Sequence, residues 1–194
     1  MLKNLRRFSS YLHASASLKM ILLAFFSQMI FAVFIIPKME SLINPLQNQV
    51  LLELRFGYTS SQFYDLMNSI GGIGIMYYKI YVLFIDILYP IIYCISYSLL
   101  LSLFFRNSFS SKHYFQLFNV FPFLIGFADV FENISVAYLL FAFPAQNLFI
   151  VKLASSFSLL KWGFTMYNIL LMLTGLFAWG FRTLLKAKKW IILK

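Results

Sequence analysis

Residues 115–143 read FQLFNVFPFLIGFADVFENISVAYLLFAF, a long apolar segment interrupted near its centre by Asp129, Glu132 and Asn133. The segment exceeds the roughly 20 residues that an α-helix needs to cross the hydrocarbon core of a bilayer. Ionisable side chains are costly at that depth, and where they occur they usually face a bundle interior or a water-filled cavity. The segment therefore predicts a membrane-spanning helix whose polar face is turned toward other helices.

Three further apolar segments have lengths suited to membrane spans, at residues 20–36, 77–105 and 153–181. The composition agrees with this interpretation. Hydrophobic residues make up 61% of the chain and charged residues 11%, whereas soluble domains have roughly 45–50% and about 25%. We expect an all-α integral membrane protein, folded as one domain over residues 1–194 into a four-helix bundle.

The net charge of +10 would suit a nucleic-acid partner, but the positions of the charges indicate a membrane topology instead. Four spans place both termini on one side, and eleven of the 16 Lys and Arg residues then lie on that side. They are Lys3, Arg6, Arg7, Lys19, Arg106, Lys112, Arg182, Lys186, Lys188, Lys189 and Lys194. The positive-inside rule predicts that both termini are cytoplasmic, with anionic lipid headgroups as partners and no nucleic acid.

The N-terminal segment leaves two interpretations of the membrane open. Residues 3–19 are basic, contain serine and lack acidic residues, as organellar transit peptides do, while residues 20–36 could form the core of a secretory signal. No small-x-small cleavage site follows that core before Pro37. We therefore expect an uncleaved signal-anchor in a bacterial inner membrane, with a mitochondrial membrane as the alternative.

The connection at residues 37–76 contains its own helix signal. Thr59 and Gln62 have the spacing of a capping box, and the apolar side chains that follow recur at helical spacing. Those side chains belong to Phe63, Leu66, Met67 and Ile70. This predicts a short outer amphipathic helix over about 60–70 that is stopped by Gly71 and Gly72, and that either lies in the outer leaflet interface or caps the bundle.

The ionisable residues within the spans share one depth. Asp86, Glu132 and Lys161 each lie about 12–16 Å from the outer end of their span, at 1.5 Å of rise per residue. In the third span Asp129, Glu132 and Asn133 have the i, i+3, i+4 relation and project from one side. These residues therefore predict a polar centre shared by the second, third and fourth spans.

The faces of the neighbouring spans support the same centre. In the second span Asp86, Tyr89, Tyr93 and Tyr97 form a stripe, and Pro90 leaves the Asp86 carbonyl without its usual N–H partner. The comparable stripe of the fourth span consists of Ser158, Lys161, Thr165 and Asn168. In the third span Gly126 allows a neighbouring helix to approach closely.

Seven residues of this centre are the expected ligand-binding set: Asp86, Asp129, Glu132, Asn133, Lys161, Tyr89 and Tyr93. Three carboxylates against one lysine leave an excess of negative charge, which favours either a protonatable carboxyl or a cation held by hard oxygen ligands. We expect no cofactor and no catalytic residue, and whether the site holds a metal stays open. Neither His13 nor His113 has a partner at ligand spacing, so the sequence contains no zinc signature. The single cysteine, Cys94, is expected to be buried in the apolar interior.

The leading functional hypothesis is a binding or transport module for a small solute, proton or cation. The alternative for the polar cluster itself is that it only fixes helix register. The competing functional class is a structural or accessory subunit whose aromatic lipid-facing surface docks on a larger membrane complex, and a homo-oligomer is also open. An intramembrane lipid-modifying enzyme with the carboxylates as acid and base is a third class.

Three segments resemble a loosely defined group of small, uncharacterised four-span membrane proteins. They are Asp86-Ile87-Leu88-Tyr89-Pro90, Asp129-Val130-Phe131-Glu132-Asn133 and Phe56-Gly57-Tyr58-Thr59. The resemblance covers roughly residues 54–162. It implies the four-span layout and the polar residues as a unit, and it implies no particular chemistry.

Overall fold

A computed structural model of the chain describes residues 2–46 and 49–192, and within these the secondary structure is all helix, with no strand. Of the residues that the structure describes, 87% are helical. Four helical segments are long and apolar enough to cross a membrane, namely Leu18–Ile43, Ser60–Ser108, Tyr114–Ala142 and Leu148–Lys186. The prediction of an all-α chain with four such segments is therefore confirmed. The side chains of Lys188, Lys189 and Lys194 lie outside the described part of the structure.

The first apolar segment continues beyond its expected end. Helix α2 (Leu18–Ile30) runs through a π-helical turn, η1 (Phe31–Ile35), into α3 (Ile36–Ile43). Pro37 has no N–H to donate and would normally disturb a helix interior. Here it lies at the start of α3, directly after the wide turn in which the Ile36 N–H donates to the Phe31 carbonyl. The helix thus absorbs the proline and ends at Ile43.

The amphipathic helix predicted over about 60–70 forms the first part of α4 (Ser60–Ile80). Thr59 and Gln62 make the capping box, with each side chain bonded to the other residue's backbone N–H. Gly71 has φ 65° and ψ −175°, which separates this part from the beginning of the second apolar segment. Phe63, Leu66 and Met67 are fully buried, so this helix caps the bundle.

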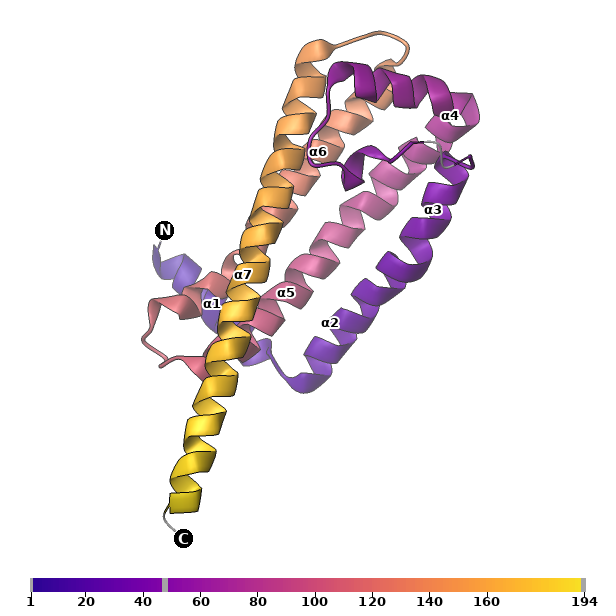
Figure 1. Cartoon of the computed structure of the whole chain (residues 1–194). Coiled ribbons are helices and arrows are strands. Elements are labelled where there is room, and N and C mark those ends of the chain that lie inside the picture. The colour runs from indigo at the N-terminus through magenta and orange to yellow at the C-terminus, as the bar shows by residue number, and fades with distance from the viewer. Residues whose placement is uncertain (1, 47–48, 193–194) are drawn as a thin grey trace.

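The remaining elements complete the bundle. A π-helical turn, η3 (Tyr81–Ile85), joins α4 to α5 (Asp86–Ser108), and a 3₁₀ segment, η4 (Tyr114–Val120), precedes α6 (Pro122–Ala142). Helix α7 (Leu148–Ile192) follows a short turn. Helix α5 lies at the centre and packs against α2, α6 and α7. Both ends of the chain lie at one end of the bundle, opposite the α3–α4 connection (Figure 1).

The N-terminal segment is itself a helix, α1 (Leu2–Ser15), held against the bundle by buried polar contacts. The Ser9 hydroxyl donates to Asn119 Oδ1 at 2.7 Å, and Asn119 Nδ2 donates to the Ser9 carbonyl and to the Ser102 hydroxyl. The Arg106 guanidinium donates to the carbonyls of His13 and Ala16. These contacts attach α1 to α5 and η4.

The close approach expected at Gly126 is present between α5 and α6. A Cβ atom added at Gly126 would lie 2.5 Å from Cys94 Sγ, which is closer than van der Waals contact allows. Cys94 is buried, as predicted, and its Sγ lies 3.1 Å from the Pro122 carbonyl oxygen. The close contact between these two helices therefore requires a residue without a side chain at position 126.

We expect Gly126→Ala to lower the free energy of unfolding by about 1–3 kcal/mol, because the added methyl group overpacks the contact with Cys94. Cys94→Ala in the same chain should recover most of the loss. Gly163→Ala is the matched control, since nothing lies within 4 Å of a Cβ at that position. Denaturant titration in detergent measures the free energy of unfolding of each variant and of the unchanged protein. If Gly126→Ala lowered this free energy equally in the presence of Cys94 and in the Cys94→Ala background, the packing described here would be contradicted.

Candidate functional site

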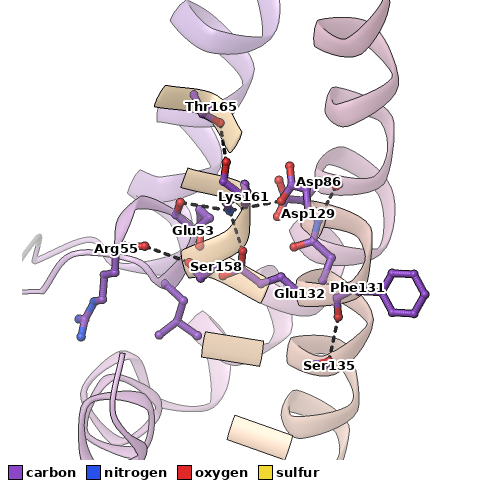
Figure 2. Close-up of polar contacts among 12 residues, drawn as sticks. Glu53, Arg55, Asp86, Asp129, Phe131, Glu132, Ser135, Ser158, Lys161 and Thr165 are labelled. Atoms are coloured by element: carbon purple, nitrogen blue, oxygen red, sulfur yellow. Dashed lines mark hydrogen bonds and ion pairs between the residues drawn. The ribbon is translucent and has the colours of Figure 1, made fainter. Parts of the chain in front are cut away.

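The side chain of Lys161 on α7 joins the polar residues of α6. Its Nζ lies 2.7 Å from Glu132 Oε2 and 3.2 Å from Asp129 Oδ1, and it lies 3.4 Å from the backbone carbonyl oxygen of Glu53. Figure 2 shows Lys161 between Glu53 on one side and Asp86 and Asp129 on the other, with Glu132 alongside. The structure therefore places Lys161 in direct contact with Asp129 and Glu132, with Asp86 beside them, at the polar centre that the sequence predicted.

The cluster is withdrawn from solvent. The exposed fractions are 8% for Lys161, 5% for Asp86, 4% for Asp129 and 1% for Glu132. Removing one member of a buried, paired group leaves the partner charge uncompensated, which is strongly unfavourable. One lysine is shared by two carboxylates here, and Asp86 makes no ion pair within the described residues.

The backbone around Asp86 explains its position. The Asp86 N–H donates to the carbonyl of Tyr81, five residues earlier, so the chain makes a wide π turn just before the carboxylate. Pro90 cannot donate to the Asp86 carbonyl, and Asn133 Nδ2 donates to that carbonyl at 2.6 Å instead. The Asp86 carbonyl, which the sequence predicted to be free, is thus bonded by Asn133 on the predicted polar face of the third span.

The Asp86 carboxylate has little hydrogen bonding of its own. Within the described part of the chain, its one hydrogen bond comes from the Tyr81 hydroxyl, which lies 3.4 Å from Oδ1. By contrast, Asp129 has both Lys161 and the Tyr93 hydroxyl, which donates to Oδ2 at 2.8 Å. Among Asp86, Asp129 and Glu132, Asp86 is therefore the carboxylate without an ion pair in the described residues.

The tyrosines of α5 form a continuous row beside the cluster. Tyr93 packs between Tyr89 and Tyr97, with ring centroids 5.3 and 5.7 Å away. Tyr97 accepts a hydrogen bond from Gln28 of α2 at 2.9 Å, and Phe31 stacks on Tyr89. The row continues from the first apolar segment to the ionisable residues, and two of its members, Tyr89 and Tyr93, belong to the predicted set.

The stripe of α7 is divided between two environments. The Ser158 hydroxyl donates to the Arg55 carbonyl at 2.9 Å and thereby holds the α3–α4 connection, as the Lys161 contact with the Glu53 carbonyl also does. The Thr165 hydroxyl bonds back to the Lys161 carbonyl within the helix. Asn168 is buried farther along α7, and its Nδ2 contacts Met172 Sδ at 3.9 Å.

Glu53 is part of the site although the sequence placed it in a connecting segment. It lies in the 3₁₀ turn η2 (Leu52–Leu54), which dips into the bundle beside α7 (Figure 1). The Tyr78 hydroxyl donates to Glu53 Oε2 at 2.8 Å and accepts from the Leu52 N–H. Leu51 and Leu52 are buried. The apolar residues next to Glu53 in the sequence are the signal that could have predicted that this segment packs inside the bundle.

A cavity of about 460 Å³ adjoins the cluster. Its floor is the face of α5 that carries Asp86 and the tyrosine row, and its walls come from the α2–α3 segment and from α7. The charged side chains that line it belong to Glu40, Glu53, Asp86, Asp129 and Lys161. The lining therefore contains more negative than positive groups.

Metal and cofactor sites of the usual kinds are not found in the described residues. No group of three or more His, Cys, Asp or Glu side chains there has the arrangement needed to hold a metal ion. His13 Nε2 lies 3.0 Å from the Gln116 carbonyl oxygen, and His113 Nδ1 accepts from the Phe115 N–H. Each histidine thus has a backbone partner.

No protein-family model, curated protein or solved structure matches this chain. The resemblance to small four-span membrane proteins therefore stays a prediction. Function has to be argued from the site itself.

The Glu53 carboxyl gives the α3–α4 connection a dependence on pH. Burial raises the pKa of Glu53 from its ordinary 4.5 to about 7, against the opposing effects of a backbone hydrogen bond, of Tyr78 and of Lys161. Because the folded state retains this proton and the unfolded segment loses it, docking of the segment is most stable below pH 4.5. That stability declines as the pH rises from about 4.5 to 7.

We expect hydrogen exchange of residues 49–58, corrected for intrinsic rates, to be faster at pH 8 than at pH 5. Glu53→Gln should remove most of this difference, because the amide stays neutral at both pH values. Mass spectrometry of peptides from this segment measures the effect, with peptides from α6 as the internal reference. An unchanged pH response in Glu53→Gln would show that another group controls docking.

The ion pairs of Lys161 generate a second expectation. Lys161→Met should lower the free energy of unfolding by about 3–5 kcal/mol, because Asp129 and Glu132 would remain buried without their partner. Neutralising all three residues, in Lys161→Met/Asp129→Asn/Glu132→Gln, should recover a large part of the loss. The control is Lys152→Met, an exposed lysine on the same helix. Thermal unfolding in detergent distinguishes the cases, and a triple variant no more stable than Lys161→Met would refute the charge argument.

Proposed function

We propose that this chain is an integral membrane protein that works as a binding or transport module for a small cationic solute or a proton, with Asp86 as the exchanging group. The observation that carries the proposal is the contrast between the carboxylates of one buried cluster. Asp129 and Glu132 share Lys161, while Asp86 lines the cavity with one long hydrogen bond. A carboxylate of this kind requires a partner cation or a proton.

The exchange follows from charge balance. In the empty cavity Asp86 holds a proton, because an unpaired ionised carboxylate is costly in a low-dielectric interior. When a monovalent cation enters, the carboxyl releases that proton and the carboxylate pairs with the cation. One charge replaces another, and the total charge of the cluster stays constant. Lys161 remains with Asp129 and Glu132 throughout.

The surrounding residues position Asp86 for this task. Asn133 holds its backbone carbonyl, and Pro90 prevents the carbonyl from being taken up within α5. The carboxylate is therefore fixed by the backbone, and its oxygen atoms stay available to a ligand. Intramembrane ionisable residues placed in this way are typical of ion and proton pathways.

The proposal also includes a membrane location with four crossings. The four apolar helical segments and the common end of the two termini support an even number of crossings (Figure 1). We propose that both termini are cytoplasmic, on the charge distribution of the sequence, that lipid covers the outer faces and that the membrane is a bacterial inner membrane. Cysteine accessibility on either side of oriented vesicles tests the orientation.

A hydrophobic carbodiimide tests the exchanging carboxyl directly. N,N′-dicyclohexylcarbodiimide reacts with protonated carboxyl groups in apolar surroundings, forming an acylisourea that rearranges to a stable N-acylurea. We expect it to label Asp86 faster than Asp129 or Glu132, and we expect added cations to slow labelling of Asp86. Peptide mapping by mass spectrometry of the protein in nanodiscs identifies the labelled residue, with Asp86→Asn as the control.

Two outcomes would contradict the proposal. One is labelling of Asp129 or Glu132 at least as fast as labelling of Asp86, which would mean that the lysine does not hold those two carboxylates ionised. The other is a rate at Asp86 that no organic or inorganic cation alters. Either result would favour a purely structural cluster.

A further inference from the structure

The cavity above Asp86 differs from a site for a bare metal ion. Its volume of about 460 Å³ lies in the range of pockets that bind organic molecules. A hard metal ion takes six or more oxygen ligands at short distances, and no group of three or more His, Cys, Asp or Glu side chains in the described residues could hold one. A cavity of this volume fits an organic ligand that carries a charged group, and is too large for a bare ion.

The lining indicates the chemistry of that body. Besides Asp86, the cavity is bordered by aromatic side chains on two sides, with Tyr89, Tyr93 and Tyr97 on α5 and Trp162 on α7. Aromatic faces attract organic cations, and quaternary ammonium ligands are commonly held in this way. Lys161 also borders the cavity, but Asp129 and Glu132 balance its charge. The carboxyl groups of Glu40 and Glu53 also line the cavity.

The opening lies between two helices. The α2–α3 segment and α7 both border the cavity, and α2 and α7 each pack on α5, but α2–α3 and α7 do not pack closely on each other in the described structure. The wall residues Ala32, Ile36, Trp162 and Thr165 are half-buried, so the cavity is accessible from the side. In a membrane-spanning bundle that side faces lipid. The α3–α4 connection, with Glu53 at its buried turn, covers the end of the cavity nearest the outer loops.

From these observations we infer that the ligand is an amphipathic organic cation, an ammonium-type head on an apolar body, which enters sideways from the bilayer between α2–α3 and α7. This inference rests on the proposed function and specifies its ligand. The charged head pairs with Asp86 against the tyrosine row, and the apolar body lies between Ile36 and Trp162. Its occupancy displaces the proton of Asp86, as described above.

Three probe ions separate the requirements of charge and of apolar body. Tetraphenylphosphonium is a lipophilic cation, tetraphenylborate has nearly the same shape with the opposite charge, and tetramethylammonium is a cation without an apolar body. We expect tetraphenylphosphonium to bind at least tenfold more tightly than either of the others to protein in nanodiscs of zwitterionic lipid. Empty nanodiscs give the background from partitioning into lipid.

Variants then locate the site and its entrance. Asp86→Asn should weaken tetraphenylphosphonium binding by about 30-fold or more, as loss of a buried charge partner does. Ala32→Trp fills the entrance from the α2–α3 side and should weaken binding at least tenfold. Val33→Trp is the matched control, because Val33 is exposed, lies on the same helical segment and does not line the cavity.

The outcomes distinguish this inference from the proposed function. Equal binding of tetraphenylphosphonium and tetramethylammonium, or equal effects of Ala32→Trp and Val33→Trp, would overturn lateral entry of an amphipathic ligand while leaving cation exchange at Asp86 in place. Equal binding of tetraphenylborate would overturn the charge requirement. Failure of every cation to slow carbodiimide labelling of Asp86 would remove both proposals together.

Discussion

The arrangement of the bundle depends on the ion pairs between one lysine of α7 and two carboxylates of α6. Lys161, Asp129 and Glu132 are all buried, and α6 and α7 pack along each other on either side of these contacts. A buried charge without its partner is strongly unfavourable, so the register between the two helices has to keep the three groups in contact. The same contact leaves Asp86 of the central helix without an ion pair, and this difference from Asp129 and Glu132 is the origin of the proposed site.

Backbone irregularities then determine what Asp86 can do. The π turn at Tyr81–Ile85 and the proline one turn after Asp86 interrupt regular helical bonding on both sides of the residue. Irregular turns of this kind occur often at functional sites in helices. Here the Asn133 amide satisfies the backbone, and the carboxylate is presented to a cavity. Structural and functional roles are thus divided between neighbouring helices, with α6 and α7 providing charge pairing and α5 providing the ligand-accessible group.

The spacing of polar residues in the sequence was enough to predict much of this site. Asp129, Glu132 and Asn133 project from one face because helical geometry requires it. Pro90 predicted a free carbonyl at Asp86, but the sequence did not identify Asn133 as its partner. Tyr81 could not be predicted as a neighbour of Asp86, because residues five apart diverge on a regular α-helix and meet here only through the π turn. Glu53 was missed because contacts with Tyr78 and Lys161, distant in sequence, draw a connecting segment into the bundle. The extension of the first helix past Pro37 likewise depends on a wide turn that no residue pattern specifies.

The central claim is that Asp129 and Glu132 are ionised with Lys161 while Asp86 alone exchanges its proton. Difference infrared spectroscopy of the carboxylic acid C=O stretch, in a Glu53→Gln background at neutral pH, tests it most directly. The account predicts an acid band that disappears on addition of a lipophilic cation and is missing in Asp86→Asn. An acid band that persists in Asp86→Asn but is lost in Asp129→Asn or Glu132→Gln would contradict it.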